Sequence, residues 1–228
     1  MIVKYTDESD DARFPGPPIP FPTPDLFWYL PETLALSYVN FDPITTWLDS
    51  SLAVNDLTCP PGSEPTFLTP ILNGFGGADF VDAAFQYGQM AGVVINLRHL
   101  FMVGKWLDTT IDGACIIGDL VVFHWHGGHS GTGDQNKVIN AALASANVTG
   151  GTAYLDGVLQ PSPASIVKPV VFSTLDFHCV GDTQVQLIGS DRVATFTNYT
   201  VVEMAGFSTM TAGEITVFRS YLRSKFAI

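Results

Sequence analysis

The chain has few basic residues, few cysteines and little charge of any kind. Of its 228 residues, 10 are Lys or Arg and 22 are Asp or Glu, so the formal net charge is −12. A phosphate backbone is repelled by such a surface, and we therefore expect no nucleic-acid partner. Cys59, Cys115 and Cys179 are widely spaced and form no Cys-x-x-Cys pair. This spacing predicts reduced thiols in an intracellular protein rather than a disulfide framework.

Long hydrophobic runs are missing as well. The longest, such as GACIIGDLVVF, are interrupted by Gly and Asp, well short of the about 20 residues that a membrane helix needs. The first residues contain no apolar core of a secretory signal. We therefore expect a cytoplasmic protein with no membrane partner. Hydrophobic residues still make up 46% of the chain, which is enough to bury a large core.

Proline is concentrated at the N-terminal end of the sequence. Seven of the 15 prolines lie within residues 1–40, and each proline fixes φ and removes a backbone donor. Residues 1–30 are therefore predicted to form an extended proline-rich arm. Because this arm also carries aromatic residues, we expect it to pack on its own domain or on a partner subunit. Residues 31–228 are then predicted to form a single domain.

Helix signals come first in this domain and strand signals follow. Pro31-Glu32 and Asp42-Pro43 are typical of helix starts, and helices are predicted at 31–40, 42–54 and 76–92. After residue 93 the pattern alternates as in strands, with an insertion near 131–160. Further strands are predicted at 165–181, 192–204 and 214–222. The order predicts an α+β fold, with N-terminal helices packed on a curved, mainly antiparallel sheet.

Three of the five histidines fall within the stretch GDLVVFHWHGGHSG, residues 118–131. If the stretch is a strand, His124 and His126 share one face. The glycine pair that follows would let His129 turn back towards the same cavity. Three interpretations stay open, namely partly exposed sheet residues, metal ligands, and proton-transfer groups that line a pocket.

The metal interpretation has a specific form. Gly118, His124 and His126 have the spacing of the first half of a cupin metal motif, and His-x-His on a strand can chelate Zn²⁺ or Fe²⁺. The second half of that motif does not follow. A third ligand would have to come from Asp176 or His178, which share a strand face and could instead form a His–carboxylate pair if that face is inward.

The order of elements resembles the nuclear transport factor 2-like superfamily. The likeness is carried by ETLALSYVNFDPITTWLDSSLAVND, a Gly-led helix, IIGDLVVFHWHGGHSG and GEITVFRSYL, over roughly residues 32–222. The most similar branches are the SnoaL-like polyketide cyclases and scytalone dehydratase. Their helices and curved sheet enclose one deep pocket, so the resemblance implies a cone-shaped α+β barrel.

The most specific part of this resemblance is HLFMVGKW, residues 99–106. Scytalone dehydratase has a His at the start of the corresponding strand and a Trp seven residues later, as His99 and Trp106 stand here. Its second catalytic His is matched by His129, and the Tyr that orients substrate and water is matched by Tyr38. The resemblance therefore implies an active-site pair of His99 and His129, with Tyr38 as a positioning group.

Two positions depart from the pattern of that enzyme. Val39 stands where it has an Asp, and Asn198 is only a candidate for its Ser-x-Asn element. Isomerisation or cyclisation therefore fits better than the same dehydration. Carboxylates that could replace the missing acid are Asp108, Asp176 and Glu203.

Together these observations predict an enzyme that uses no cofactor and no metal. It would be an isomerase, cyclase or dehydratase for a small apolar secondary metabolite, such as a polyketide or terpenoid intermediate. One imidazole would remove a proton and another would return it. The predicted catalytic residues are His99, His129, His124 and His126, the substrate-binding residues are Tyr38, Phe101, Tyr87, Trp106 and Asn198, and the supporting acids are Asp176 and Glu203.

The second hypothesis is a non-catalytic binding or scaffolding protein of the same fold. It predicts a homodimer through the outer face of the sheet, with Val121, Phe123 and Trp125 as contacts. An open, ligand-sized pocket would favour the enzyme, whereas a pocket filled by its own side chains would favour this alternative.

Overall fold

The computed structural model describes residues 21–110, 116–121, 124–193 and 195–228. Its architecture is α+β, with a large and mostly antiparallel sheet, as predicted. The main path of the sheet runs through β4 (Thr66–Leu72), β5 (Phe75–Phe80), β13 (Tyr199–Phe207), β6 (Gly88–Trp106), β10 (Ser173–Ile188), β8 (Thr152–Leu155) and β9 (Val158–Leu159). Short strands attach to this path, namely β1 (Phe27–Tyr29), β2 (Thr46–Trp47), β3 (Leu57–Thr58) and β7 (Ile117–Gly118). A separate pair is formed by β11 (Ser190–Asp191) and β12 (Thr195–Phe196).

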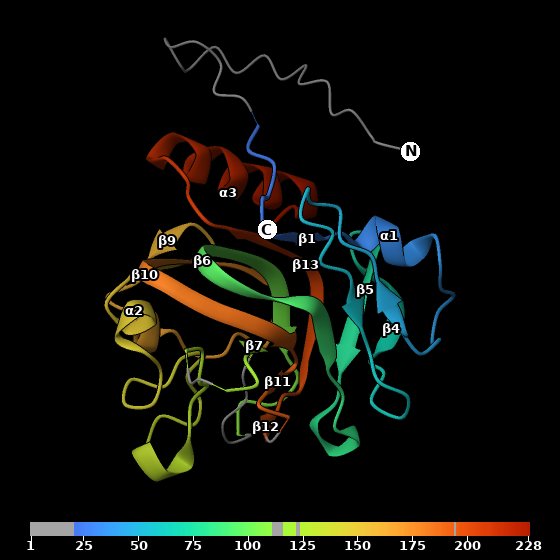
Figure 1. Cartoon of the computed structure of the whole chain (residues 1–228), viewed down its shortest axis with the longest axis horizontal. Helices are drawn as coiled ribbons and strands as arrows, with labels where there is room; N and C mark the ends of the chain where they lie inside the picture. The colour runs from blue at the N-terminus through green and yellow to red at the C-terminus, as the bar shows by residue number, and fades with distance from the viewer. Residues whose placement is uncertain (1–20, 111–115, 122–123, 194) are drawn as a thin grey trace.

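Two long strands form the middle of the sheet (Figure 1). β6 has 19 residues and β10 has 16, and they pair antiparallel with His99 opposite His178. β13 lies on the other side of β6, with Phe207 opposite His99. Directly opposed residues point their side chains to the same face of a sheet. His99, His178 and Phe207 therefore lie together on one face.

The sheet stays open within the described residues. Its path ends at β4 on one side and at β9 on the other, so it does not close into a barrel. Part of the insertion predicted near residues 131–160 joins the sheet, because β8 pairs with β10 and β9 pairs with β8. No helix in the described part of the chain is long and apolar enough to cross a membrane.

Helices are short except at the C-terminal end. Within the described residues the α-helices are α1 (Pro31–Ala35), α2 (Ala146–Thr149) and α3 (Ala212–Phe226), and the 3₁₀ turns are η1 (Asp82–Ala84), η2 (Ser130–Thr132) and η3 (Pro163–Ser165). The prediction of a strand at 214–222 is wrong, because these residues belong to α3. A capping box between Thr211 and Glu214 starts this helix. Phe218, Leu222 and Phe226, at intervals of four residues, give it one buried face.

The helices predicted at 42–54 and 76–92 are also wrong. Residues 46–47 form β2, and the side chain of Asp49 accepts hydrogen bonds from the backbone N–H groups of Trp28, Ser51 and Asn55. Such side-chain bonds compete with the backbone bonds of a helix. Residues 76–92 hold most of β5, η1 and the start of β6. A Cβ on Gly77 would lie 2.4 Å from the carbonyl oxygen of Val201, so glycine here permits close strand pairing rather than a helix start.

The histidine stretch is not a continuous strand either. β7 covers Ile117–Gly118 only, and residues 124–129 are irregular. Asp119 turns the chain directly after β7, because its Oδ1 accepts a hydrogen bond from the backbone N–H of Val121 at 2.7 Å. The alternation of faces expected for residues 118–126 therefore does not apply to the described part of this stretch.

α3 covers one face of the sheet (Figure 1), and the core is divided accordingly. Beneath α3, Phe101, Phe207 and Phe218 pack with ring centroids 4.9 to 5.8 Å apart. The larger core cluster includes Trp47 and Trp106. The described part of the predicted arm begins at residue 21 and joins the sheet as β1, which pairs with β13. Residues 1–20, Cys115 and Phe123 lie outside the described residues.

Candidate functional site

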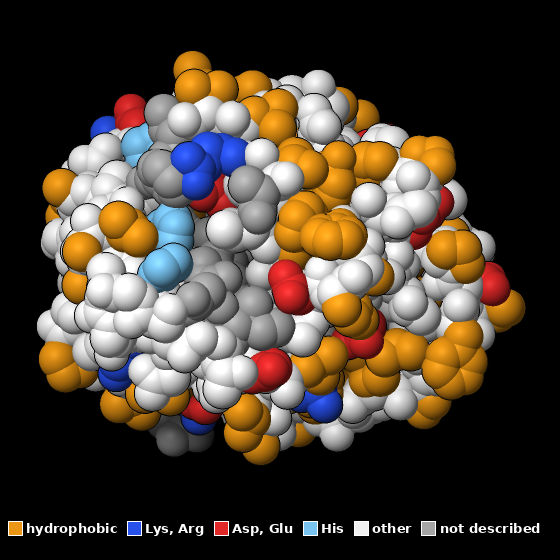
Figure 2. All heavy atoms as spheres, turned by 90° about the horizontal axis from the view of Figure 1, so that it is seen from below, with side chains coloured by type: hydrophobic (Ala, Val, Ile, Leu, Met, Phe, Trp, Pro, Cys, Tyr) orange, Lys and Arg blue, Asp and Glu red, His pale blue; other side chains and the backbone are white. Residues whose placement is uncertain are grey.

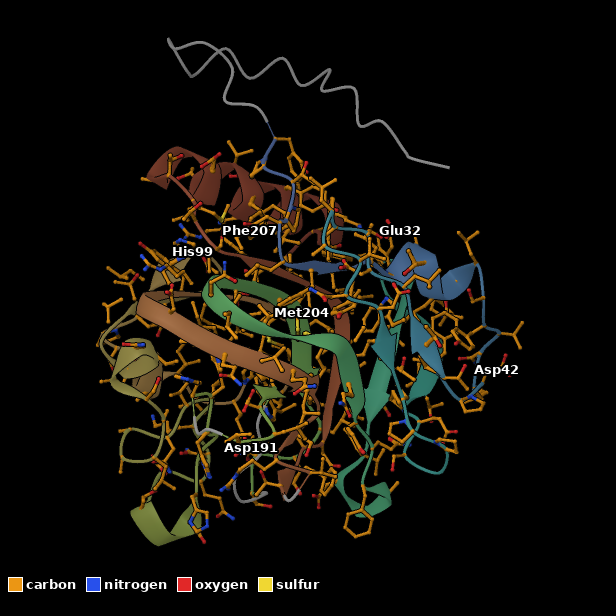
Figure 3. All side chains as sticks on the ribbon, in the orientation of Figure 1. Glu32, Asp42, His99, Asp191, Met204 and Phe207 are labelled. Carbon is orange, nitrogen blue, oxygen red and sulfur yellow. The ribbon has the colours of Figure 1, made fainter. Side chains whose placement is uncertain are left out.

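Two histidines meet on adjacent strands beneath α3. Their Nδ1 atoms are 2.9 Å apart and their ring centroids are 5.2 Å apart. The pairing of β6 with β10 sets this contact, because His99 and His178 are direct partners in the register. Figure 3 shows His99 at the end of the sheet that lies near α3, on the same side as Phe207. The short distance requires that one Nδ1 donates a proton and the other accepts it.

A buried carboxylate continues the chain of contacts. Asp176 lies two residues before His178 on β10, and its side chain therefore points to the same face. Its Oδ2 lies 3.1 Å from Nε2 of His178 and accepts hydrogen bonds from Nε of Arg219, at 2.8 Å, and from Nη2 of the same residue. Asp176 is 1% exposed. Asp176 and His178, which the sequence placed on one strand face, are therefore in contact, and Arg219 supplies the counter-charge that a buried carboxylate needs.

Aromatic side chains hold this group of residues in place. The guanidinium of Arg219 lies 3.7 Å from the centroid of the Tyr154 ring, a cation–π contact. The rings of Phe101 and Tyr154 meet the His178 ring edge to face, at 5.6 and 5.8 Å. We name His99, His178, Asp176 and Arg219 together the His99–Arg219 network.

The contacts assign the protons within the His99–Arg219 network. A carboxylate only accepts hydrogen bonds, so Nε2 of His178 donates to Asp176. Nδ1 of His178 then accepts the proton of Nδ1 of His99, which leaves Nε2 of His99 with a free lone pair. Burial, and then the charges of His178 and Arg98, lower the pKa of His99 to about 4, while Asp25 acts in the opposite direction. At neutral pH the His99 ring is therefore uncharged and able to accept a proton.

The three histidines of the 118–131 stretch have other hydrogen-bond partners. His124 places Nδ1 3.0 Å from the hydroxyl of Ser145, and His126 places Nδ1 2.7 Å from the carbonyl oxygen of Gly127. Nδ1 of His129 accepts a hydrogen bond from the backbone N–H of Gly131 at 3.0 Å, as the N-cap of η2. Burial lowers the pKa of His124. The rings of His126 and His129 are 6.3 Å apart, so this loop brings two of its histidines near each other.

The expected pair of His99 and His129 is not formed. His99 contacts His178, and it lies near α3 at the top of Figure 3, whereas the η2 turn that His129 caps lies at the bottom of the view in Figure 1. Histidine side chains also gather on one side of the face seen from below in Figure 2. The stretch leaves the sheet after Gly118, so no strand carries His129 alongside β6.

The predicted substrate-binding residues are dispersed, except for Phe101. The Tyr38 hydroxyl donates to the carbonyl oxygen of Thr46 at 2.9 Å, and Asn198 accepts a hydrogen bond from the backbone N–H of Asp82. Trp106 stacks on Tyr199 and Tyr87 packs near Phe196, with ring centroids 6.0 and 6.2 Å apart. In the described part of the chain, these contacts of Tyr38, Tyr87, Trp106 and Asn198 do not involve the His99–Arg219 network.

The other predicted acids have different settings. Glu203 is 0% exposed and accepts hydrogen bonds from Nε1 of Trp28 and from Nζ of Lys225, each at 2.8 Å. Burial raises the pKa of Glu203, and Lys225 counteracts this. Asp108 accepts bonds from the backbone N–H and hydroxyl of Thr110, which lower its pKa. Glu203 therefore binds α3 through Lys225, whereas the His99–Arg219 network binds α3 through Arg219.

A cavity of about 300 Å³ lies elsewhere, at the start of β6. It is lined by Thr58, Pro60, Gln89, Met90 and Ala91, none of which is a predicted site residue. The described residues contain no group of three or more His, Cys, Asp or Glu side chains that could hold a metal ion. His124, His126, Asp176 and His178 therefore do not form the metal set considered from the sequence.

Sequence reasoning missed Arg219 and gave His178 no catalytic role. The signal for His178 was its position two residues after Asp176, which places both on one strand face. Arg219 could not be recognised because residues 214–222 alternate like a strand. These residues form part of α3, and the helix places Arg219 beside Asp176 of the sheet. Comparisons of the chain with protein-family models, with curated proteins and with solved structures found no match. The chemistry of the site is therefore argued from its geometry.

Proposed function

We propose that the chain is a cofactor-free acid–base enzyme in which His99 is the catalytic base. Its reaction would be an isomerisation, a cyclisation or a dehydration of a small, mostly apolar metabolite, such as a polyketide or terpenoid intermediate. The observation that carries the proposal is the 2.9 Å contact between His99 and His178, which Asp176 continues. An uncharged imidazole oriented by a second polar group is the usual arrangement of a general base.

The proposed reaction begins with a proton transfer to Nε2 of His99. The proton comes from a carbon next to a carbonyl or from a hydroxyl group of the substrate. The positive charge that His99 then carries is stabilised through His178 by the carboxylate of Asp176. His99 returns the proton to a different carbon in an isomerisation or cyclisation, or to a departing hydroxyl in a dehydration. His178, Asp176 and Arg219 act as positioning residues.

The surroundings of His99 suit an apolar substrate. Phe207 lies opposite His99 on β13, and Phe101 lies two residues further along β6 on the same face. His99 itself is partly exposed, so its ring is reachable from outside the core. The apolar neighbours also keep the pKa of His99 low, because they withhold solvation from its charged form.

Turnover by alanine variants tests this proposal. The protein is incubated in D₂O with a panel of polyketide and terpenoid ketones and alcohols, and mass spectrometry follows rearrangement, loss of water and deuterium uptake next to the carbonyl. We expect His99→Ala to lower the turnover by at least about 10²-fold, the usual contribution of a general base. The matched control is His129→Ala, which should keep turnover close to that of the wild type.

Two outcomes would contradict the proposal. One is wild-type turnover by His99→Ala, and the other is a loss in His129→Ala as large as in His99→Ala. Circular dichroism of each variant shows whether a loss reflects chemistry or folding. If no compound of the panel reacts, the non-catalytic alternative is favoured instead.

That alternative, a binding or scaffolding protein, has one observation in its favour. The described cavity of about 300 Å³ is not lined by any residue of the His99–Arg219 network. Its dimer contacts need revision, however, because Trp125 is 4% exposed and its Nε1 donates to the hydroxyl of Thr183 at 3.2 Å. Val121, 75% exposed, remains available. Sedimentation of wild type and Val121→Asp checks whether this position contributes to a dimer.

A further inference from the structure

The side chain of Lys225 is enclosed between α3, β13 and α1. Its Nζ lies 2.8 Å from Oε2 of Glu203, on β13, and 2.8 Å from Oε1 of Glu32, which Figure 3 shows on α1. The side chain of Lys225 is 4% exposed and that of Glu203 is 1% exposed, whereas that of Glu32 is 49% exposed. A buried amine therefore contacts one buried carboxyl group and one that reaches solvent.

A β-bulge directs Glu203 towards α3. The register of β13 against β6 shifts between Val201 and Glu203. Val202 packs in the cluster beneath α3, and Glu203 bonds to Lys225 of the same helix. Two successive residues of β13 therefore reach the helix, although side chains of a regular strand alternate between its faces. Bulges commonly re-aim a side chain in this way beside reactive sites.

Aromatic rings surround the amine. Nζ of Lys225 lies 5.3 Å from the ring centroid of Phe75, 5.5 Å from that of Tyr221 and 5.2 Å from that of Phe226. The hydroxyl of Tyr221 is 3.1 Å from the same Nζ. Rings in these positions keep water away from the contact between Lys225 and Glu203, and so protect a bond formed there from hydrolysis.

The two oxygens of Glu203 have different partners. Oε1 accepts a hydrogen bond from Nε1 of Trp28 at 2.8 Å, whereas Oε2 faces Nζ of Lys225 at 2.8 Å. A donor on Oε1 stabilises the negative charge that develops on this oxygen when an amine attacks Cδ. Burial also raises the pKa of Glu203 and thereby favours the neutral carboxyl group, the form that an amine can attack.

We propose that Lys225 and Glu203 condense to an amide, so that the chain forms its own covalent cross-link between α3 and β13. Nζ of Lys225 attacks Cδ of Glu203, the bond from Cδ to Nζ forms, and the bond from Cδ to Oε2 breaks. Two protons leave Nζ, are carried by Glu32 and reach Oε2, which departs as water. An ammonium and a carboxylate thus become one amide and one water, with no change in net charge and no further reactant. The cross-link does not depend on the proposed catalysis.

The buried setting favours the amide over the ion pair. In bulk water this condensation is unfavourable, because the ammonium and the carboxylate are well solvated. Here the reacting groups are held in contact, and well-oriented intramolecular reactions reach effective concentrations of about 10⁵–10⁸ M. The amide also replaces two charges that are costly to bury. Its oxygen can keep the hydrogen bond from Trp28, and its N–H can donate to Glu32.

Mass spectrometry of the denatured full chain tests the cross-link, because denaturant separates an ion pair but not an amide. We expect the wild type to be lighter than its sequence by one water. Trypsin should then leave residues 193–219 joined to residues 224–228, since it does not cut after an acylated lysine. Lys225→Arg keeps the positive charge but should have its full mass. The matched control is Lys105→Arg, which changes a lysine that lies 4.8 Å from the ring centroid of Phe172 and should lose water as the wild type does.

The rate of bond formation tests the role of Glu32. The full chain is made by cell-free synthesis, and its mass is followed over time. We expect Glu32→Gln to form the cross-link at least about 10²-fold more slowly than the wild type, the usual contribution of a group that transfers protons. Equal rates would overturn the proton route through Glu32.

The cross-link would be overturned by a wild-type chain that is folded, as circular dichroism shows, and that has its full mass. It would also be overturned if fragmentation of the joined peptides placed the bond on Glu214, the other acid of residues 193–219, instead of Glu203. The mass of the wild type decides the question, so a variant that does not fold leaves the test intact. No substrate is needed, and the outcome is therefore separate from that of the turnover experiment.

Discussion

The loop at residues 124–129 and the strand pair of β6 and β10 use the same side chain in different ways. In the loop, the ring of each histidine bonds to the loop itself or to nearby Ser145. On the strands, His99 bonds to His178, 79 residues away, and the chain of contacts ends at Arg219 of α3. His126 and His129 contact neighbours in the sequence and His124 contacts Ser145, 21 residues away, whereas the strand contacts require the whole sheet. Closeness in the sequence is therefore a poor guide to which histidines act together.

The largest expected effect lies in the strand pair and concerns the buried ion pair of Asp176 and Arg219. Asp176→Asn leaves the charge of Arg219 without its buried partner, and we expect it to lower the free energy of unfolding by about 3–5 kcal/mol. Denaturant titration measures this loss. The matched control is Asp182→Asn, which breaks the pair with Arg98, whose side chains are 44% and 54% exposed, and should cost less than about 1 kcal/mol. Equal losses in the two variants would show that the strand network adds no special stability.

A smaller effect is expected in the pH dependence of stability. The pKa of His99 is about 4 in the folded chain and about 6.5 in the unfolded chain, so the unfolded state takes up its proton first. The contribution of His99 is complete above pH 6.5 and is lost as the pH falls to 4. For a ring that is partly open to solvent, we expect this loss to be about 1–2 kcal/mol.

Unfolding of His99→Gln between pH 7 and pH 4 checks this expectation. The variant should lose less stability than the wild type over that range, whereas His129→Gln should follow the wild type. A steeper loss of stability with falling pH in His99→Gln would reverse the sign of the effect. It would contradict the lowered pKa of His99 in the folded chain.

The smallest effect is expected in the loop. The side chain of Ser145 makes no capping bond to α2, so Ser145→Ala removes little besides its bond to Nδ1 of His124. We expect a cost of about 0.5–1 kcal/mol. A double-mutant cycle with His124→Ala isolates the interaction between the two side chains. A coupling energy above about 2 kcal/mol between Ser145 and His124 would contradict this expectation, because the loop contact would then be as strong as the contacts between the strands.

The sequence was sufficient to predict the sheet but not its register. Alternating apolar residues after position 93 correctly predicted a mainly antiparallel sheet, and Asp176 and His178 were correctly placed on one face. The contact of His99 with His178 could not be predicted, because it depends on how two long strands align. A shift of one residue would place the two rings on opposite faces.

The missed and misplaced elements have local causes. Residues 42–54 have the spacing of a helix, but the side chain of Asp49 binds the backbone N–H groups of Ser51 and Asn55. Residues 214–222 alternate like a strand, but the capping box and the four-residue spacing of Phe218 and Leu222 make them helical. Arg219 belonged to this segment, so the error in secondary structure concealed a member of the site.

The carboxylate of Glu203 joins the two ends of the described chain. It accepts one hydrogen bond from Trp28 of β1 and another from Lys225 of α3. Removing either segment would leave the buried Glu203 with one hydrogen-bond donor fewer, and would weaken the attachment of the remaining segment. Fusion tags are therefore best attached through a spacer that leaves β1 and α3 intact, and fragments that lack one of them should be handled as different folding units.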